Sequence, residues 1–353
     1  MTPALLLAAA LAAAPAPLPA YGPPTVLFRL ADPSLDELSG LVAGSRPGVL
    51  FAHEDSGASA SFVALGRTGR TRTTFRVPGV TAVDWEDVSR GPDERGESCL
   101  WFADTGDNRE TRDTVTVVRV REPVVGDAAT ETTEAPDVFR FSYPDGPHDA
   151  EALLVSPDSG RLWVVTKTLG SAGVYEAPDL RAGATQELIR TGTVPLAPTG
   201  TPGGPAGLAG QIAVTGGAVA PDAARVALRT YTDLYEWPVT RDDLGAALTG
   251  TPTRTALPAS PQGEAVAYRA DGRAVLVAGE GARSTVVELP VGRAAGAEPS
   301  PTATPAPAPA RPRPESHPYV VPAVAAVLAG ITWLYRRRRR PLPSRRELRA
   351  RGR

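Results

Sequence analysis

Residues 150–178 read AEALLVSPDSGRLWVVTKTLGSAGVYEAP and contain three apolar segments separated by short polar turns. The first two segments are nearly continuous apolar runs, which is typical of strands buried on both faces. The turn SPDSGR between them carries Pro, Asp, Ser and Gly, the residues that favour tight turns. The stretch therefore predicts three consecutive antiparallel strands.

The same pattern occurs five times along the chain and forms an internal repeat. First strands are expected in DELSGLVA (36–43), WEDVSRG (85–91), AEALLVSP (150–157), TGGAVAPD (215–222) and GEAVAYRAD (263–271). Second strands follow as GVLFAHEDSG, CLWFADTGDN, RLWVVTKTLG, RVALRTYTD and AVLVAGEGAR. Third strands follow as SFVALG, VTVVRV, GVYEAP, LYEWPV and TVVELP.

Fourth strands are expected at 71–79, 137–144, 185–195 and 251–258. The fifth repeat lacks one, and TVLFRLADP (25–33) supplies it if the two ends of the domain pair. Four-stranded units around an axis remove unpaired sheet edges, so we predict an all-β fold, a β-propeller of five blades over 22–293. Six blades are the alternative, because 176–214 is long enough for another pair of strands. A β-sandwich would not explain five repeats of a four-strand unit.

The N-terminal segment 1–20 is predicted to be a signal peptide. Residues 4–14 are an uninterrupted apolar run, followed by alternating prolines among small residues, and cleavage is expected near Ala16 or Ala20. The run is too short for a transmembrane helix, and the prolines would break its extension.

The C-terminal region is predicted to anchor the protein in the cell membrane as a single-pass protein. Residues 319–335 form an uncharged apolar segment, predicted to be a transmembrane helix, and 336–353 hold ten Arg and one Glu. The positive-inside rule places this tail in the cytoplasm and the N-terminal domain outside. Between domain and helix, 294–318 is a Pro- and Ala-rich stalk.

Charge and cysteine content restrict the partners. The tail carries +9 and the whole chain −2, so the rest carries −11, which argues against nucleic acid as a partner and favours cations or basic groups. Cys99 is the only cysteine, so the hydrophobic core and not disulfides must hold the domain. We expect a monomer that binds an extracytoplasmic ligand or an envelope protein.

Acidic residues recur where the predicted first strands begin and second strands end. Because adjacent strands in a blade are antiparallel, these positions lie on one rim of the channel. The residues that we predict to hold a divalent cation there are Glu37, Asp55, Glu86, Asp104, Asp107, Asn108, Glu151, Glu264 and Glu280. Crowded carboxylates shift their pKa values, pair with cations or bind a hard metal, and Ca²⁺ suits oxygen ligands on loops.

Two interpretations without a metal remain open for this rim. Asp and Asn commonly cap β-turns, which is their usual role as single residues. Lys167 and Arg229, at the ends of the third and fourth second strands, could neutralise the acids as ion pairs. His53, His148 and Lys167 are the candidate catalytic residues, because the histidines each neighbour an acid and an imidazole can act as a base or a ligand.

The chain resembles secreted β-propeller proteins related to the esterase-like phytase and gluconolactonase groups. The resemblance rests on ELSGL (37–41), HEDSG (53–57), DWED (84–87), DTGDN (104–108) and the DAEA and QGEA repeats. In gluconolactonase-type propellers, side chains at the channel mouth hold a divalent metal that polarises the substrate. The resemblance implies this role for Glu37, Glu86, Asp104, Glu151 and Glu264.

Two functions follow from these patterns. The first is a membrane-anchored binding or scaffold module with a divalent-cation site at one rim. The alternative is a metal-dependent hydrolase of an ester, lactone or phosphate, in which the metal acts as a Lewis acid and a neighbouring Glu or His as the base. An enzyme needs that base within reach of the metal, which distinguishes the two.

Overall fold

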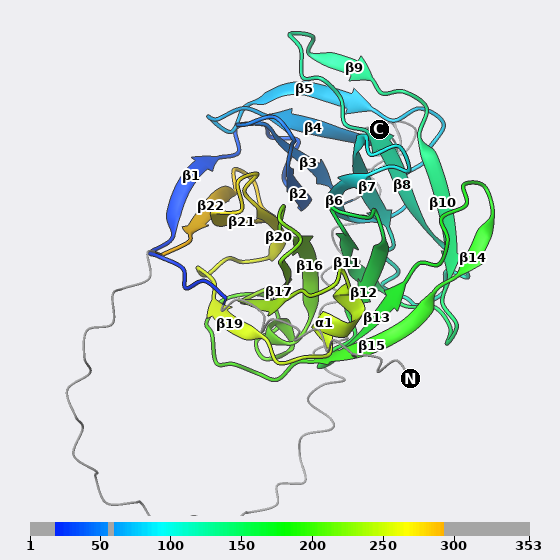
Figure 1. Cartoon of the computed structure of the whole chain (residues 1–353). Coiled ribbons are helices and arrows are strands. Elements are labelled where there is room, and N and C mark those ends of the chain that lie inside the picture. The colour runs from blue at the N-terminus through cyan, green and yellow to red at the C-terminus, as the bar shows by residue number, and fades with distance from the viewer. Residues whose placement is uncertain (1–17, 56–59, 293–353) are drawn as a thin grey trace, which may run out of the picture.

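The computed structural model describes residues 18–55 and 60–292, and Figure 1 shows them as five small sheets arranged in a ring. Each sheet contributes one four-stranded blade, which confirms the predicted five-bladed β-propeller. Most of the predicted signal peptide, together with the predicted stalk, transmembrane helix and Arg-rich tail, lies outside the described residues. Within the described part, no helix has the length and apolarity needed to cross a membrane.

The first three blades follow the repeat in chain order. Blade 1 consists of β2 (Leu38–Ala43), β3 (Leu50–Glu54), β4 (Ser61–Leu65) and β5 (Thr71–Arg76). Blade 2 consists of β6 (Trp85–Pro92), β7 (Ser98–Asp104), β8 (Val115–Arg121) and β10 (Asp137–Ser142). Blade 3 consists of β11 (Ala150–Val155), β12 (Leu162–Thr166), β13 (Ser171–Glu176) and β15 (Ile189–Pro195).

The last two blades close the ring. Blade 4 consists of β16 (Val214–Val219), β17 (Arg225–Thr230), β18 (Asp233–Pro238) and β19 (Thr253–Ala256). Blade 5 consists of β20 (Gly263–Tyr268), β21 (Ala274–Gly279), β22 (Thr285–Pro290) and β1 (Thr25–Arg29). The antiparallel pairing of β1 with β22 confirms that the N-terminal strand completes the last blade.

Two short strands extend the blades in a way that the repeat does not predict. β9 (Thr130–Thr132) pairs in parallel with β5 of blade 1, and β14 (Thr185–Glu187) pairs in parallel with β10 of blade 2. The single strand predicted at 185–195 is therefore two strands on different blades. The buried Leu188 separates them, and β15 alone completes blade 3. Helices are minor, with a 3₁₀ turn at Ala209–Gln211 and α1 at Leu244–Leu248.

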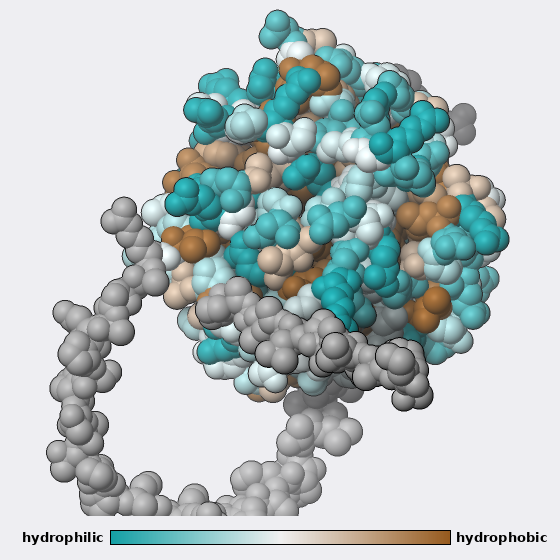
Figure 2. Space-filling view, in the orientation of Figure 1, coloured by the Kyte–Doolittle hydropathy of each residue, from teal (hydrophilic) through white to brown (hydrophobic). Residues whose placement is uncertain are grey.

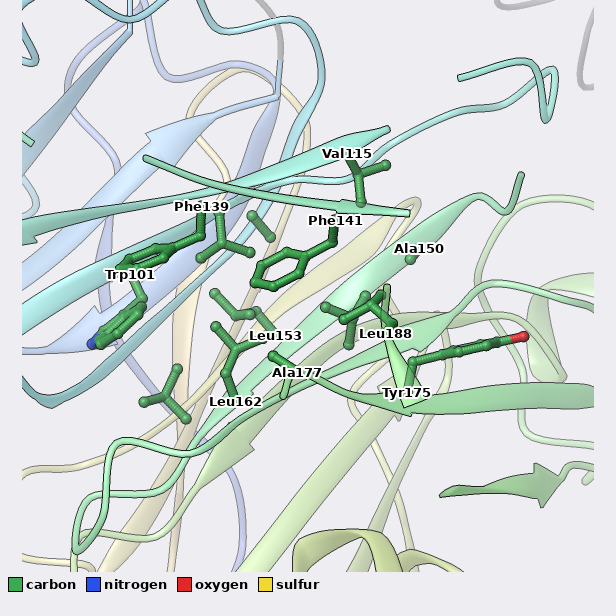
Figure 3. Packing of buried hydrophobic residues seen from close by; sticks show 14 of the residues in the cluster. Trp101, Val115, Phe139, Phe141, Ala150, Leu153, Leu162, Tyr175, Ala177 and Leu188 are labelled. Atoms are coloured by element: carbon green, nitrogen blue, oxygen red, sulfur yellow. The ribbon is translucent and has the colours of Figure 1, made fainter. Parts of the chain in front are cut away.

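Hydrophobic clusters fill the spaces between neighbouring blades. Figure 3 shows the cluster between blades 2 and 3, where Trp101 stacks on Phe139 with ring centroids 5.7 Å apart. The tryptophans Trp85, Trp101, Trp163 and Trp237 are all at most 1% exposed. They serve as packing residues, and Figure 2 shows that the apolar residues left on the viewed face form small separate patches.

The five innermost strands, β2, β6, β11, β16 and β20, surround the axis (Figure 1). They all begin at the same face of the ring, which we call the upper face. Since β22 is the third strand of its blade, it ends at the opposite face. There the Gly292 N–H donates to the Ala20 carbonyl at 2.7 Å and Tyr21 pairs with Val291. Both ends of the described ring therefore lie on the face opposite the starts of the innermost strands.

Candidate functional site

A β-bulge stands at the beginning of each innermost strand. The register of pairing with the second strand shifts between Trp85 and Asp87 in blade 2 and between Ala150 and Ala152 in blade 3. Equivalent shifts occur in the other blades. The side chains in the bulges are Ser39, Glu86, Glu151, Thr215 and Glu264. All five are at most 7% exposed, so each blade places one polar side chain at the upper end of the channel.

Blade 1 differs from the sequence prediction at this position. Ser39, and not Glu37, occupies the bulge, and its hydroxyl donates to Glu264 at 3.4 Å. Glu37 lies two residues earlier and is partly exposed, and its backbone N–H donates to the Glu54 carboxylate at 3.3 Å. Its counterparts two residues before the bulge are Asp84 in blade 2 and Asp149 in blade 3.

Five carboxylates from blades 1 to 3 form what we call the acidic cup: Asp55, Asp84, Glu86, Asp149 and Glu151. They make two triads that share Glu86, one with Asp55 and Asp84 and the other with Asp149 and Glu151. In each triad, one oxygen of every residue lies within 4.8 Å of the others. Ca²⁺ takes oxygen ligands at about 2.3–2.6 Å, so oxygens on opposite sides of one ion are about 5 Å apart. Each triad therefore fits a divalent cation.

Asp84 and Asp149 were not among the predicted ligands, although a signal for them exists in the sequence. Both belong to a D-x-E pattern, DWE at 84–86 and DAE at 149–151, which occurs at the start of two neighbouring innermost strands. Residues two apart in a strand point to the same side, so the pattern itself directs both acids toward the same mouth.

The segment DTGDN at 104–108 forms the wall of the cup. A Cβ at Gly106 would lie 2.0 Å from Glu86 Oε1, so only glycine allows this close approach. Asp104 accepts from the N–H of Asp84 at 3.2 Å and forms an ion pair with Arg112 at 2.9 Å. These bonds hold the loop that carries Asp84.

The remaining residues of that segment have the local contacts expected of turn residues. Asp107 accepts from the backbone N–H of Thr111 and of Arg112, the latter at 2.6 Å, and its own N–H donates to Asp149 at 2.8 Å. Asn108 is exposed. The structure therefore does not bring Asp104, Asp107 or Asn108 into either triad.

Lys167 is the single lysine of the chain, and its ammonium lies beside the cup. It forms an ion pair with Glu151 and lies 5.4 Å from the centroid of the Tyr231 ring. Burial alone would lower the pKa of Lys167, but the carboxylates of Glu151 and Asp149 and the Tyr231 hydroxyl raise it well above its ordinary value. Lys167 is therefore a permanent cation that offsets one of the negative charges.

The acids at the mouth hold protons more tightly than ordinary carboxyl groups. Burial, followed by repulsion from Glu151 and Asp84, raises the pKa of Glu86 well above its ordinary value. Burial raises the pKa of Glu151 to about 8, although Lys167 opposes this shift. Burial and repulsion from Glu280 raise the pKa of Glu264 in the same direction. A cation at the mouth would compete with these protons, which is the usual behaviour of metal-binding carboxylates.

Blades 4 and 5 complete the rim without joining the triads. Arg229 is buried and donates to the carbonyls of Ala265 and Ala278 at 2.8 and 2.9 Å. Burial lowers the pKa of Arg229 to about 10. The Gln262 amide donates to Glu280. Since Thr215 occupies the bulge of blade 4, this side of the mouth has fewer acids, and Lys167 faces it.

The two candidate histidines lie apart from the cup. His53 is 1% exposed, and its ring makes edge contacts with Trp85 and Phe102, with centroids 5.7 Å away in both cases. Burial lowers the pKa of His53 to about 4. A Cβ at Gly40 would lie 2.0 Å from His53 Nε2, so the glycine of ELSGL makes room for the imidazole. His53 is therefore neutral at physiological pH and part of the core between blades 1 and 2.

His148 belongs to a separate group of polar residues on the upper face. Its Nε2 lies 2.9 Å from Asp145 and 3.0 Å from the Tyr175 hydroxyl. Asp145 also accepts from Tyr175 at 2.9 Å and from Arg190 at 3.1 Å. These contacts fasten the loop that leads to Asp149.

Asp87 lies below the mouth, at a level of the channel that we call the waist. Its carboxylate accepts from the backbone N–H of Val88 and of Leu153 at 2.8 Å each, and of Gly217 at 3.0 Å. These donors belong to blades 2, 3 and 4, so one side chain joins three innermost strands. At Gly217 a Cβ would lie 2.7 Å from Leu154, so glycine is needed where the strands approach.

Comparisons with known proteins do not identify a family. No protein-family model matches the chain, and no curated protein is similar to it in sequence. The similar solved structures include a glucose dehydrogenase, with a TM-score of 0.42 and 11% identity over 76% of this chain and 99% of that chain. The β-propeller domain of Cps50 (Swd1) from Myceliophteria thermophila has a TM-score of 0.38 and 11% identity over 76% and 99%.

A luciferin-regenerating enzyme has a TM-score of 0.38 and 12% identity, over 72% of this chain and 77% of that chain. Identities of this size and TM-scores below 0.5 carry no information on substrate or activity. The chain is therefore described by its own architecture, a five-bladed β-propeller with an acidic cup at the upper end of its channel.

Proposed function

We propose that this protein is a membrane-anchored extracytoplasmic binding module whose acidic cup binds a divalent cation, with Ca²⁺ as the best fit. The observation that supports this most strongly is the pair of carboxylate triads, each with two buried members, built from three neighbouring blades. Ca²⁺ accepts six to eight oxygen ligands, tolerates irregular geometry and favours charged carboxylates. The bound ion would neutralise the mouth and provide coordination positions for oxygen atoms of a ligand.

The experiment measures metal content and thermal unfolding of the full chain, purified in detergent after chelation. We expect Ca²⁺ to raise the unfolding midpoint, since a ligand that binds only the folded state stabilises it by mass action. Glu86→Gln and Glu151→Gln should abolish most of this increase. As a matched control, Asp179→Asn changes an acid that is 88% exposed and should leave the increase unchanged. A wild-type chain with no bound metal and a constant midpoint would overturn the proposal.

The orientation of the ring supports a partner outside the cell, provided that the predicted anchor exists. The chain enters and leaves the ring on the face opposite the cup, at Ala20 and Gly292. A C-terminal tether would therefore attach to that face and leave the cup directed outward. Cysteine labelling of intact cells tests this arrangement, because the natural Cys99 is buried. We expect Asp179→Cys to react with an impermeant maleimide and Gly352→Cys to react only after lysis. The reverse pattern would exclude the proposed topology.

A metal-dependent hydrolase is the second candidate, and Glu264 is the residue that supports it. Glu264 lies on the same rim, outside both triads, and burial and repulsion from Glu280 raise its pKa, as expected for a carboxyl group that acts as a general acid or base. If the cup is an active site, Ca²⁺-dependent hydrolysis of nitrophenyl esters or phosphates should disappear in Glu264→Gln, which retains the metal. Metal binding without hydrolysis of either class would favour the binding module.

A further inference from the structure

A pocket separate from the acidic cup lies on the upper face between blades 4 and 5, which are neighbours in the ring (Figure 1). One wall is formed by residues 258–261, which lead from β19 into β20, and the other by the turn 280–284 between β21 and β22. The volume of this pocket is about 280 Å³. We call it the arginine pocket, because its charged lining consists of three arginines and one acid: Arg29, Arg229, Arg283 and Glu280.

The pairing register of blade 5 directs Arg29 into this pocket. Arg29 is the partner of Thr285, and cross-strand partners point to the same side of a sheet. Val287, two residues after Thr285, packs against the cluster between blades 4 and 5, so this side faces blade 4. The Arg29 side chain is exposed and makes no hydrogen bond or ion pair with any residue in 18–55 or 60–292. Its guanidinium is therefore available to a ligand.

Arg283 belongs to the same wall. The Leu30 N–H donates to the Ser284 carbonyl at 2.9 Å, and these two residues directly follow Arg29 and Arg283. The bond therefore holds the backbones of the two arginines close together. Arg283 has a φ of +60°, a left-handed conformation that is uncommon for a residue other than glycine. Its exposed side chain likewise has no hydrogen-bond or ion-pair partner within the described ranges.

A serine hydroxyl at the pocket wall also lacks a partner. The Ser284 hydroxyl oxygen is buried, and none of the described residues forms a hydrogen bond with it. A buried hydroxyl without a hydrogen bond is costly, and its hydrogen can rotate toward an acceptor. An oxygen atom of a ligand in the arginine pocket would supply that acceptor.

The other two charges of the pocket are already engaged. Arg229 is 2% exposed and donates to the carbonyls of Ala265 and Ala278, so it contributes positive charge and no direct contact. Glu280 accepts from the Gln262 amide. Even if the charges of Arg229 and Glu280 balance each other, the two arginines of the outer wall leave the pocket positive.

We propose that the arginine pocket binds a tetrahedral oxyanion, a phosphate or sulfate, either free or as a group on a small ligand. The planar fork of a guanidinium matches two oxygens of such an anion, so Arg29 and Arg283 can each hold one edge. The Ser284 hydroxyl would donate to a further oxygen. The volume lies near the lower end of the range of small-molecule sites, which suits one such group. None of the five acids of the cup lines this pocket, so the proposal does not require a metal in the cup.

The test is calorimetric titration of phosphate, sulfate and acetate into the full chain, after a chelating resin has removed metal ions. Phosphate and sulfate should each bind once per chain. Acetate should bind at least about tenfold more weakly, because it has one charge and two oxygens. Arg29→Gln and Arg283→Gln should each lower the affinity for phosphate about tenfold, since each removes a charge-assisted contact. As a matched control, Arg181→Gln changes an arginine outside the pocket whose side chain is 70% exposed, and it should bind phosphate as the wild type does.

The outcomes separate this proposal from metal binding by the cup. A wild-type chain that binds neither phosphate nor sulfate overturns the proposal and leaves the cup unaffected. An equal loss of affinity in Arg181→Gln also overturns it, because the effect would then come from overall charge. Acetate binding as tight as that of phosphate would exclude the tetrahedral class of ligand.

Protection against phenylglyoxal, which modifies accessible arginines, needs no variant. At a phosphate concentration of about ten times Kd, the modification of Arg29 and Arg283 should slow about tenfold, since only the unliganded chain reacts. Modification of Arg181 should keep its rate, and peptide mapping distinguishes the three sites. Equal rates with and without phosphate at Arg29 and Arg283 would contradict the proposal.

Discussion

The mouth and the waist of the channel differ, although Glu86 and Asp87 are neighbours in the sequence. Both side chains are at least 93% buried, and burial raises the pKa of both. Asp87 accepts three backbone N–H groups from three blades, whereas Glu86 has none among the described residues. Burial alone therefore does not distinguish an acid that holds the fold together from one that is available to a ligand. The presence or absence of donors does.

Removing the acid at the waist should have the largest effect. Asp87→Ala leaves three buried N–H groups from different blades without an acceptor, and we expect a loss of about 3–5 kcal/mol in the free energy of unfolding. Urea denaturation measures this value. Asp87→Asn keeps an acceptor oxygen and should lose less. A loss below about 1 kcal/mol for Asp87→Ala would mean that the three bonds do not join the blades.

The pH dependence of stability should be the next largest effect. Glu151 has a folded pKa of about 8, above its value in the unfolded chain, so between pH 6.5 and 8 the folded state holds more protons. Without metal, the free energy of unfolding should therefore fall as pH rises. The fall from pH 6.5 to pH 8 should be about 2 kcal/mol for each proton that the folded state binds and the unfolded state does not. The pKa of His53 is lowered to about 4 and the pKa of Lys167 is raised, so neither group changes its protonation in the folded state within this window.

Urea unfolding at pH 6.5 and pH 8 in the presence of chelator checks this dependence. Saturating Ca²⁺ should reduce the loss, because the ion replaces the protons at high pH. If the free energy of unfolding without metal is constant or rises over this range, the acids at the mouth are not buried as a group.

Glu86→Gln should stabilise the metal-free protein, whereas Asp87→Ala should destabilise it. Glu86→Gln replaces a buried acid whose ionised form is disfavoured by burial and by neighbouring carboxylates, so at pH 8 without metal we expect a gain of about 1–3 kcal/mol in the free energy of unfolding. The same variant should lose the Ca²⁺-dependent increase. Chemical denaturation with and without Ca²⁺ measures both. If Glu86→Gln destabilises the metal-free protein as Asp87→Ala does, the contrast between mouth and waist is invalid.

Gly106→Ala should act on the mouth with a smaller effect. Its Cβ would meet Glu86 Oε1 at 2.0 Å, and the flexible carboxylate can move away. We expect about a tenfold loss in Ca²⁺ affinity, which corresponds to about 1.4 kcal/mol, with little change in the metal-free stability. Calorimetry provides the affinity. Unchanged affinity would show that the position of Glu86 is not important for binding.

The smallest effect is expected for His148→Ala. The bonds of His148 to Asp145 and Tyr175 lie on a partly exposed loop, so their loss should cost below about 1 kcal/mol and leave the Ca²⁺ stoichiometry unchanged. Thermal unfolding and metal analysis test both statements. Loss of a bound ion would give the loop before Asp149 a role in the cup.

Much of the fold follows from local patterns that the chain repeats. Five similar groups of apolar segments with turn residues between them predict blades, because the apolar pattern of each segment predicts a buried strand. The pairing of β1 with β22 is also predictable, since the fifth repeat lacks a fourth strand and the strand predicted at 25–33 belongs to no repeat. The parallel strands β9 and β14 were not predictable, because they are short and pair with a different blade from the one that follows them in the chain.

The candidate site was predictable only in part. Glu86, Glu151 and Glu264 occupy equivalent bulges as the repeat indicates, and Asp55 joins a triad with Glu86. The residue pattern does not reveal that the bulge of blade 1 holds Ser39, because Glu37 lies just before β2 begins at Leu38. The pattern also does not reveal that the adjacent acids of DWED have different roles, with Glu86 in the bulge and Asp87 bound to backbone N–H groups of three blades.

The sequence by itself determined the propeller fold, favoured five blades over six, and indicated the strand that closes the ring and the acidic character of one rim. These properties depend on residue types at regular intervals. Only the tertiary structure decided which acids meet, because contacts across the axis join residues from different blades, such as Asp87 with Gly217, which are 130 positions apart. It also decided that His53 is part of the core and that the single lysine is the counter-ion of the cup, since burial and neighbouring charges arise only when the ring closes.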